Sequence, residues 1–262
     1  MKVSCIVITR NSQEFIEECL LSLRRCKELY PNTEIIVIDN YSTDKTFEIA
    51  ERLADKAIHF GTERVAQANY GIIMSEGDVI YLTGSDMTRD IDFISQGVAK
   101  IKEGYDAVYM SVKTDKRVKH FWGRVKALER ECYIDTYIES ARFFTKGAWK
   151  VLGGFNLGVI GLEEDFQHRL DAEGFKTGRI LAREYHLHEE NSLIKMFKKA
   201  FYYGKFHRTY LSEHGKRGLK QLFPIRPNFE RFLKEPLLLI GLIVSKFVWY
   251  LGGLLGLIIG RR

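Results

Sequence analysis

The chain has 262 residues, 45% of them hydrophobic, and a formal net charge of +6 at pH 7. This length allows one large α/β domain with an appendage, and the hydrophobic content excludes a disordered chain. Much of the positive charge follows residue 195, close to an apolar C-terminal stretch, which indicates a partner such as anionic membrane lipid and argues against nucleic acid.

The four cysteines form no CxxC pair, so we expect reduced, structural thiols in a cytoplasmic protein. The chain opens with a strand over residues 3–8, a polar loop from Thr9 to Ser12, and a helix over 13–29 that Ser12 caps. A second strand follows, which makes a βαβ unit with parallel strands. Thr9 and Asp39 are therefore expected side by side at one sheet edge.

The second strand is a continuous apolar run, Ile35–Ile38, as expected of a strand buried on both faces of a parallel sheet. It stops at Asp39, at the carboxyl edge where ligands bind in open α/β sheets. Asp44 is interpreted as a cap of the next helix, over 46–54. Asp39 could merely end its strand, but an acid there needs a partner, so we interpret it as a ligand contact.

The middle of the chain repeats the alternation of strands and helices. We expect a strand over 57–60, a helix from Glu63 to about Gly77 and a strand over 78–82 that leads into Gly84-Ser85-Asp86. A helix within 87–102 and a strand over 105–112 follow. The stretch 113–131 is basic, which is typical of a solvated face.

A second group of polar residues follows the loop Gly153-Gly154-Phe155-Asn156. Three consecutive acids, residues 163–165, open a helix there, and this is more than a cap requires. Further on, His186 and His188 alternate along an extended segment, which places both rings on one side. Two histidines are weak evidence for a metal, and a pair of surface histidines remains an alternative.

The sequence of the C-terminal part is typical of a membrane-associated segment. A helix over 193–211 interleaves cations with aromatic residues, as interfacial helices do. The apolar run 237–260 would extend about 36 Å as a helix. Lys246 interrupts it at a cost of ~3 kcal/mol, but fifteen Leu, Ile, Val and Phe residues each return about 0.3–0.6 kcal/mol. The run is thus a transmembrane or re-entrant anchor, with the preceding domain on the cytoplasmic side by the positive-inside rule.

These motifs resemble glycosyltransferase family 2, the GT-A nucleotide-sugar transferases. The resemblance rests on the run from Asp39 to Thr46, on Gly153–Asn156 and on the segment from Glu164 to Leu170, and it covers about residues 1–210. It implies an α/β GT-A fold, a mostly parallel twisted sheet flanked by helices. The nucleotide half would be 1–90 and the acceptor half 91–210, followed by a basic juxtamembrane segment, 211–235, and the anchor, 236–260.

The resemblance also implies a set of site residues. Those expected to contact the donor are Thr9, Arg10, Asn11, Asp39, Asn69, Ser85 and Asp86. Asp86 matches the second acid of the family's Asp-x-Asp motif and would ligate Mg²⁺ or Mn²⁺, whereas Gly84 replaces the first acid and weakens that expectation. His188 is the preferred second ligand and His186 the alternative. Asp165 matches the general base, and Glu164 is the adjacent acid.

The implied function is the inverting transfer of a sugar from a nucleotide-sugar donor, with a metal stabilising the departing diphosphate. A membrane-anchored enzyme of this kind suits a lipid-linked acceptor such as a polyprenyl phosphate. Two other functions stay open. A degenerate member would bind nucleotide sugar without transfer, and Gly84 is its only support. A nucleotidyltransferase would carry a Gly-rich phosphate loop after the first strand, which Thr9-Arg10-Asn11-Ser12 does not resemble.

Overall fold

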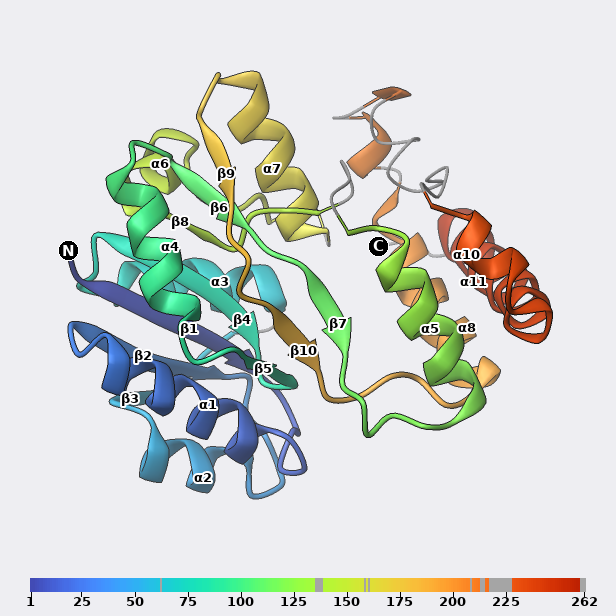
Figure 1. The fold of residues 1–262 in the computed structure, drawn as a ribbon, viewed down its shortest axis with the longest axis horizontal. Coiled ribbons are helices and arrows are strands. Elements are labelled where there is room, and N and C mark those ends of the chain that lie inside the picture. The colour runs from blue at the N-terminus through green and yellow to red at the C-terminus, as the bar shows by residue number, and fades with distance from the viewer. Residues whose placement is uncertain are drawn as a thin grey trace. The chain divides into compact units, whose positions relative to one another are not determined.

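A computed structural model describes residues 1–61, 63–134, 139–157, 159, 161–207, 209–212, 215–216 and 228–259. The chain forms two compact units (Figure 1). The first comprises Met1–Ser111, Ser140–Leu157 and Gly161–His186, and the second is built mainly from Val112–Glu139 and Leu187–Arg262. Each unit is therefore assembled from segments that are distant in the sequence.

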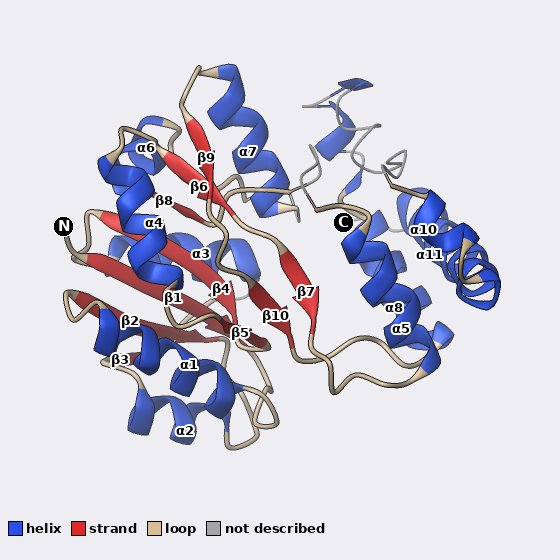
Figure 2. Cartoon of the chain, in the orientation of Figure 1, coloured by secondary structure: helices blue, strands red, loops and turns tan. Residues whose placement is uncertain are grey.

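The first unit is built on a seven-stranded sheet, drawn in red in Figure 2. Its strand order is β3 (Lys56–His59), β2 (Thr33–Asp39), β1 (Val3–Thr9), β4 (Val79–Gly84), β8 (Phe143–Thr145), β6 (Ala107–Tyr109) and β9 (Thr177–Arg179). The first four strands are parallel, and β8 runs antiparallel to both of its neighbours. The mostly parallel α/β sheet predicted from the sequence is confirmed.

Helices cover both faces of this sheet (Figure 1). On one face lie α1 (Ile16–Leu29), α2 (Thr46–Leu53) and α4 (Phe93–Lys102). On the other lie α3 (Arg64–Ile73), α6 (Lys146–Val151) and α7 (Leu162–Ala172). Alternate residues of β2 enter the two cores, Ile35 and Val37 on one side and Ile36 and Ile38 on the other. This double burial explains why β2 is apolar at every position of that run.

Two predicted elements are corrected. The first helix begins at Ile16 and not at Gln13, because the carbonyl of Ser12 accepts the amides of Phe15 and Ile16 in a preceding turn. The single strand predicted over 105–112 is two strands, β6 and β7 (Val112–Thr114), which belong to different units. A short antiparallel pair, β5 (Met87–Arg89) with β10 (Glu184–His186), follows the carboxyl end of β4.

The second unit contains four helices whose bounds are described: α5 (Phe121–Glu131), α8 (Leu193–Gly204), α10 (Glu230–Leu233) and α11 (Pro236–Ile259). By length and composition α11 can cross a membrane, with a mean hydropathy of 2.0 over its most apolar window. It packs on α5 and α8. Of the predicted juxtamembrane segment, residues 213–214 and 217–227 lie outside the described part of the chain.

Candidate active site at the carboxyl edge of the sheet

The carboxylate of Asp39 lies at the carboxyl end of β2, opposite Thr9 of β1, as the βαβ pattern predicts. Its side chain is 0% exposed. One oxygen accepts the amide of Ser42 at 2.9 Å and lies 3.0 Å from His59 Nδ1, and the other accepts the Ser42 hydroxyl at 2.5 Å. The imidazole of His59 stacks on Tyr41 and Phe47. Asp39 is thus a buried acid at the sheet edge, held in one orientation by Ser42 and His59.

Three hydroxyl groups connect the end of β1, which lies beside Asp39, to the end of β4. Thr9 Oγ1 donates to Ser85 Oγ at 2.9 Å, and Ser85 Oγ donates to Ser12 Oγ at 2.9 Å. Gln67 of α3 donates to the carbonyls of Thr9 and Ile38, at 3.0 and 2.7 Å. Because Gln67 is buried and binds both strand ends, it fixes the spacing between β1 and β2. Neither the Gln67 clamp nor His59 was predicted from the sequence.

The loop after β1 is held against the loop after β2. The backbone amide of Asn11 donates to Ser42 Oγ at 2.7 Å, and its side-chain oxygen Oδ1 accepts the backbone amide of Thr43 at 2.9 Å. Asn11 adopts a left-handed backbone with φ of 48°, a conformation that asparagine tolerates better than most residues. Arg10, next to it, is exposed. Asn11 therefore fixes this loop through both its backbone amide and its side chain, while Arg10 is exposed to solvent at the same edge.

Asp86 lies just beyond β4, and β10 brings a histidine to it. His186 Nε2 is 3.3 Å from Asp86 Oδ2, and the two side chains are 22% and 36% exposed. A Cβ at Gly84 would lie 2.9 Å from Asp86 Oδ1, so the position of the missing first acid faces the second. His188 belongs to the second unit, where its Nε2 lies 4.0 Å from Glu190 Oε2. The structure thus brings the alternative histidine, His186, to Asp86.

No group of three His, Cys, Asp or Glu side chains arranged to hold a metal occurs among the described residues. Asp86 and His186 supply one carboxylate and one imidazole, both of which are ligands that Mn²⁺ accepts. Two protein ligands leave most of an octahedral shell to other groups. The pair therefore fits a metal site that is completed by a bound ligand.

Asn69 is engaged with a glycine-rich loop. Its amide nitrogen donates to the Phe155 carbonyl, and its amide oxygen accepts the Phe155 amide, both at 2.9 Å. The two preceding glycines both have left-handed backbones, with φ of 72° at Gly153 and 85° at Gly154. Asn69 thus anchors the loop that leads toward α7 to helix α3.

The three acids of α7 have different surroundings. Asp165 is 1% exposed, and Arg169 binds one of its oxygens through Nε at 2.9 Å and Nη2 at 2.8 Å. Glu163 pairs with Arg64 at 3.1 Å. Burial, together with the neighbouring charge of Glu163, raises the pKa of the Glu164 carboxyl. The pKa of Glu164 is therefore moved toward neutrality.

A buried ionic cluster lies between β4 and β10. Glu184, which is fully buried, accepts the hydroxyl of Tyr81, the hydroxyl of Thr83 at 3.3 Å and Arg142 Nη1 at 3.0 Å. Arg89, also buried, stacks over the Tyr81 ring. The cluster ties β4 to β10, the strand that ends in His186. The sequence pattern missed it, because Glu184 and Arg142 are 42 residues apart.

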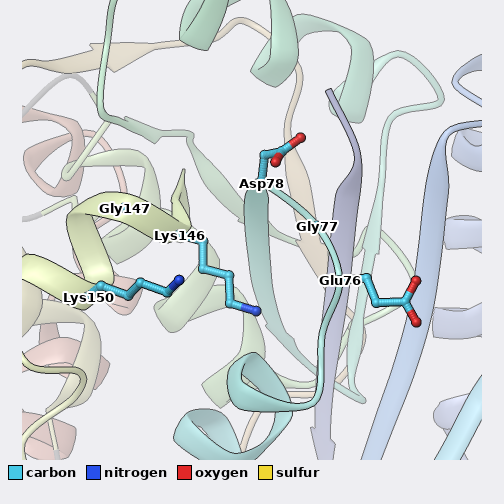
Figure 3. A pocket seen from close by; sticks show the side chains of 6 residues that line it. All are labelled: Glu76, Gly77, Asp78, Lys146, Gly147 and Lys150. Carbon is cyan, nitrogen blue, oxygen red and sulfur yellow. The ribbon is translucent and has the colours of Figure 1, made fainter.

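A hollow of about 420 Å³ lies at the other end of β4. It is lined by Glu76, Gly77, Asp78, Lys146, Gly147 and Lys150 (Figure 3). Burial lowers the pKa of Lys146, whose ammonium donates to the Ser75 carbonyl at 2.6 Å. Because Asp78 precedes β4 and Asp86 follows it, this hollow opens at the amino edge and does not belong to the site built around Asp39 and Asp86.

Comparison with known families matches residues 4–159 to the family described as Glycosyl transferase family 2. The match covers more than half of the 262 residues. The chain belongs to glycosyl transferase family 2. A relative from Proteus mirabilis, named undecaprenyl-phosphate 4-deoxy-4-formamido-L-arabinose transferase, is 28% identical over 116 residues. That alignment covers 41% of this chain and 36% of the relative, so the chain spans about a third of it.

Solved structures show the same fold. Staphylococcus aureus TarS (residues 1–349), in complex with UDP-GlcNAc, has a TM-score of 0.59 and 17% identity, covering 80% of this chain and 67% of TarS. The mannosyltransferase PcManGT of Pyrobaculum calidifontis, in complex with GDP-Man and Mn²⁺, has a TM-score of 0.59 and 16% identity, covering 96% and 72%. The GT-A fold expected for this family 2 member is confirmed.

Proposed function

We propose that this family 2 protein transfers a sugar, with inversion, from a nucleotide-sugar donor to an acceptor hydroxyl or phosphate. One observation carries the proposal: Asp39, the Thr9–Ser85 pair and Asp86 lie where β2, β1 and β4 end at the carboxyl edge of one sheet, and β10 of the smaller sheet brings His186 to Asp86. Asp39, with Thr9, Arg10 and Asn11, would receive the nucleoside. Ser85 and Asp86 would face the diphosphate. TarS and PcManGT bind nucleotide sugars on the same fold.

We infer that Asp86 and His186 hold Mg²⁺ or Mn²⁺. PcManGT, which has the same fold, is in complex with Mn²⁺ and supports the use of a divalent cation. When bound, the cation would stabilise negative charge on the leaving diphosphate. His188, the ligand preferred on sequence grounds, stays the alternative. With Gly84 in place of the first acid, the donor's diphosphate would supply ligands that the protein lacks. Cation and donor should therefore bind together.

We assign removal of the acceptor's proton to the acidic residues at the start of α7. In the reaction the acceptor oxygen attacks the anomeric carbon and the bond to the diphosphate breaks. A hydroxyl acceptor gives its proton to a carboxylate, whereas a phosphate acceptor attacks through an oxygen that is already ionised near neutral pH. Glu164 suits this step because its raised pKa makes it a better base near neutral pH. Asp165, the base expected from the family motif, is bound by Arg169 and would hold α7 in place. Substitution of each acid separates the two roles.

The acceptor that we propose is lipid-linked, for example a polyprenyl phosphate. Two observations support it: the Proteus mirabilis relative is named an undecaprenyl-phosphate transferase, and α11 is long and apolar enough to enter a membrane. The family 2 domain would then lie at the cytoplasmic face, as the positive-inside rule indicates. Attachment to the membrane brings a soluble donor and a lipid acceptor to one site.

Calorimetric titration of the full-length protein with UDP- and GDP-sugars, with and without Mn²⁺, tests donor binding. Release of nucleoside diphosphate in the presence of polyprenyl phosphate then tests transfer. Asp39→Asn should weaken binding of every nucleotide sugar, whereas the matched control Asp44→Asn, which changes the acid that accepts the Thr46 amide at the start of α2, should not. Binding without release under all conditions would identify a nucleotide-sugar-binding protein and refute the proposed transfer.

A further inference from the structure

The Asp39 carboxylate is enclosed by the protein, and its partner His59 is not. Ser42 donates to both oxygens of Asp39, whose side chain is 0% exposed, and His59 Nδ1 lies 3.0 Å from Oδ2. The His59 side chain is 41% exposed. The two residues are register partners at the carboxyl ends of β2 and β3. Of this pair, the imidazole is therefore the member that a ligand at the sheet edge meets.

The imidazole of His59 is held in one orientation by three contacts. Besides Asp39, the ring of Phe47 stacks on it at a centroid distance of 3.6 Å, and the ring of Tyr41 lies nearly parallel to it at 5.5 Å. A carboxylate only accepts hydrogen bonds, so Nδ1 is the donor to Asp39, and Nε2 of the neutral ring is then an acceptor that points away from Asp39. Within the described part of the chain, Nε2 has no hydrogen-bond partner. His59 thus presents a fixed, unused acceptor.

Tyr41 supplies an aromatic surface next to this acceptor. The residue is 62% exposed, and its backbone has a φ of 48°, a conformation that a bulky residue rarely adopts. Such strain persists only where the surroundings impose it, and it is concentrated at ligand sites. Every nucleobase has a face that stacks on an aromatic ring, so Tyr41 can contribute affinity without distinguishing one base from another. Selection between bases requires a polar group, which His59 provides.

The place of His59 in the sheet indicates which end of the donor it meets. The strands β3, β2, β1 and β4 are consecutive neighbours, so the end of β3 is three strand spacings, about 14 Å, from the end of β4. Asp86 follows β4 and is the proposed partner of the diphosphate. In a nucleoside diphosphate the base is the group farthest from the terminal phosphate. A donor with its diphosphate at Asp86 therefore directs its base toward β3.

We propose that His59 selects the nucleobase of the donor through Nε2, and that Asp39 acts by fixing the imidazole tautomer. Uracil has a ring N–H at N3 and guanine has one at N1, and either can donate to Nε2. Cytosine and adenine carry a lone pair on the corresponding ring nitrogen, which repels an acceptor. This inference rests on the donor binding proposed above, and it names the donor class: a uridine or guanosine diphosphate sugar.

Nucleotides that differ at this ring nitrogen test the proposal without changing the protein. Calorimetry of the full-length chain with Mn²⁺ compares UDP with CDP and GDP with ADP, because each pair keeps the size of the base. We expect UDP to bind on the order of tenfold more tightly than CDP, or GDP than ADP. Methylation of the preferred nucleotide, at N3 of UDP or at N1 of GDP, should remove the same factor. Equal binding of the methylated and unmethylated forms would overturn the proposal.

A substitution at His59 assigns the effect to its acceptor. His59→Phe keeps an aromatic ring against Phe47 and removes Nε2, so methylation of the nucleotide should cause no further loss in this variant. Tyr41→Ala should weaken both members of each pair alike. The matched control Lys56→Met changes the opposite end of β3 and should keep the wild-type preference. An undiminished preference in His59→Phe would refute the role of His59.

Failure of this inference can be told from failure of the proposed function. If all four nucleotides bind with equal affinity, the assignment to His59 is wrong, while donor binding and transfer stand. If none of the four binds, the donor site proposed above fails, and the assignment to His59 fails with it.

Discussion

Neutralising the adjacent acids Glu164 and Asp165 should have different effects: loss of the Asp165 charge should lower Tm, whereas loss of the Glu164 charge should lower the transfer rate. Asp165→Asn breaks a nearly fully buried ion pair in which Arg169 is 25% exposed. Removing one partner of a buried pair costs about 3–5 kcal/mol, and the partial exposure of Arg169 favours the lower end. For a domain of this size about 3 kcal/mol corresponds to a fall in Tm of about 6–12 °C.

Glu164→Gln should leave Tm unchanged or slightly higher at pH 7. Burial and the charge of Glu163 raise the pKa of Glu164, so its contribution to folding stability is present below the ordinary glutamate pKa and is lost as the pH rises through the folded value. Above the folded pKa its charge destabilises the fold, and glutamine removes that charge. Transfer to a hydroxyl acceptor should nevertheless fall by roughly 10²–10⁴, the usual contribution of a general base.

Differential scanning calorimetry of both variants is compared with nucleoside diphosphate release at several pH values. The wild-type rate should rise as Glu164 ionises, and Glu164→Gln should lose that dependence. If Glu164→Gln transfers sugar at the wild-type rate, the base is not Glu164. If Asp165→Asn stops transfer while Tm and donor affinity stay unchanged, Asp165 is the base, as the family motif implies.

Three further predictions follow from individual contacts. Gly84→Asp places a second carboxylate beside Asp86 and should strengthen Mn²⁺ binding in the absence of donor, as measured by calorimetry; unchanged affinity would contradict the proposed cation site. Glu129→Gln leaves the ammonium groups of Lys126 and Lys246 without their counter-charge, so Tm should fall. Burial alone would raise the pKa of Glu129, but those cations hold it well below its usual range, so the difference in Tm should shrink as the pH falls; a pH-independent difference would argue against this charge effect. Asn69→Ala frees both backbone groups of Phe155 and should lower the unfolding free energy by about 1–3 kcal/mol with donor affinity retained; a selective loss of donor affinity would make Asn69 a donor contact.

The local pattern of the chain determined most of the first unit. A parallel strand covered on both faces must be apolar throughout, so Ile35–Ile38 was recognisable as a central strand, and the acid that ends it had to lie at the carboxyl edge. The parallel register of β1 and β2, which places Thr9 opposite Asp39, follows from the βαβ connection. The pair of Asp165 with Arg169 follows from helical spacing of four residues.

Only the tertiary structure decided which distant groups meet. His59 of β3 lies beside Asp39 of the neighbouring strand β2, Arg142 pairs with the buried Glu184 of β10, and Lys246 pairs with Glu129 on another helix. His186 and His188 look equivalent in the sequence, yet β10 ends at His186 and brings that ring to Asp86. Periodicity tells which face a residue occupies, because it reflects the geometry of one strand or helix. It does not tell which side chain of another element faces it, because that depends on how the elements pack.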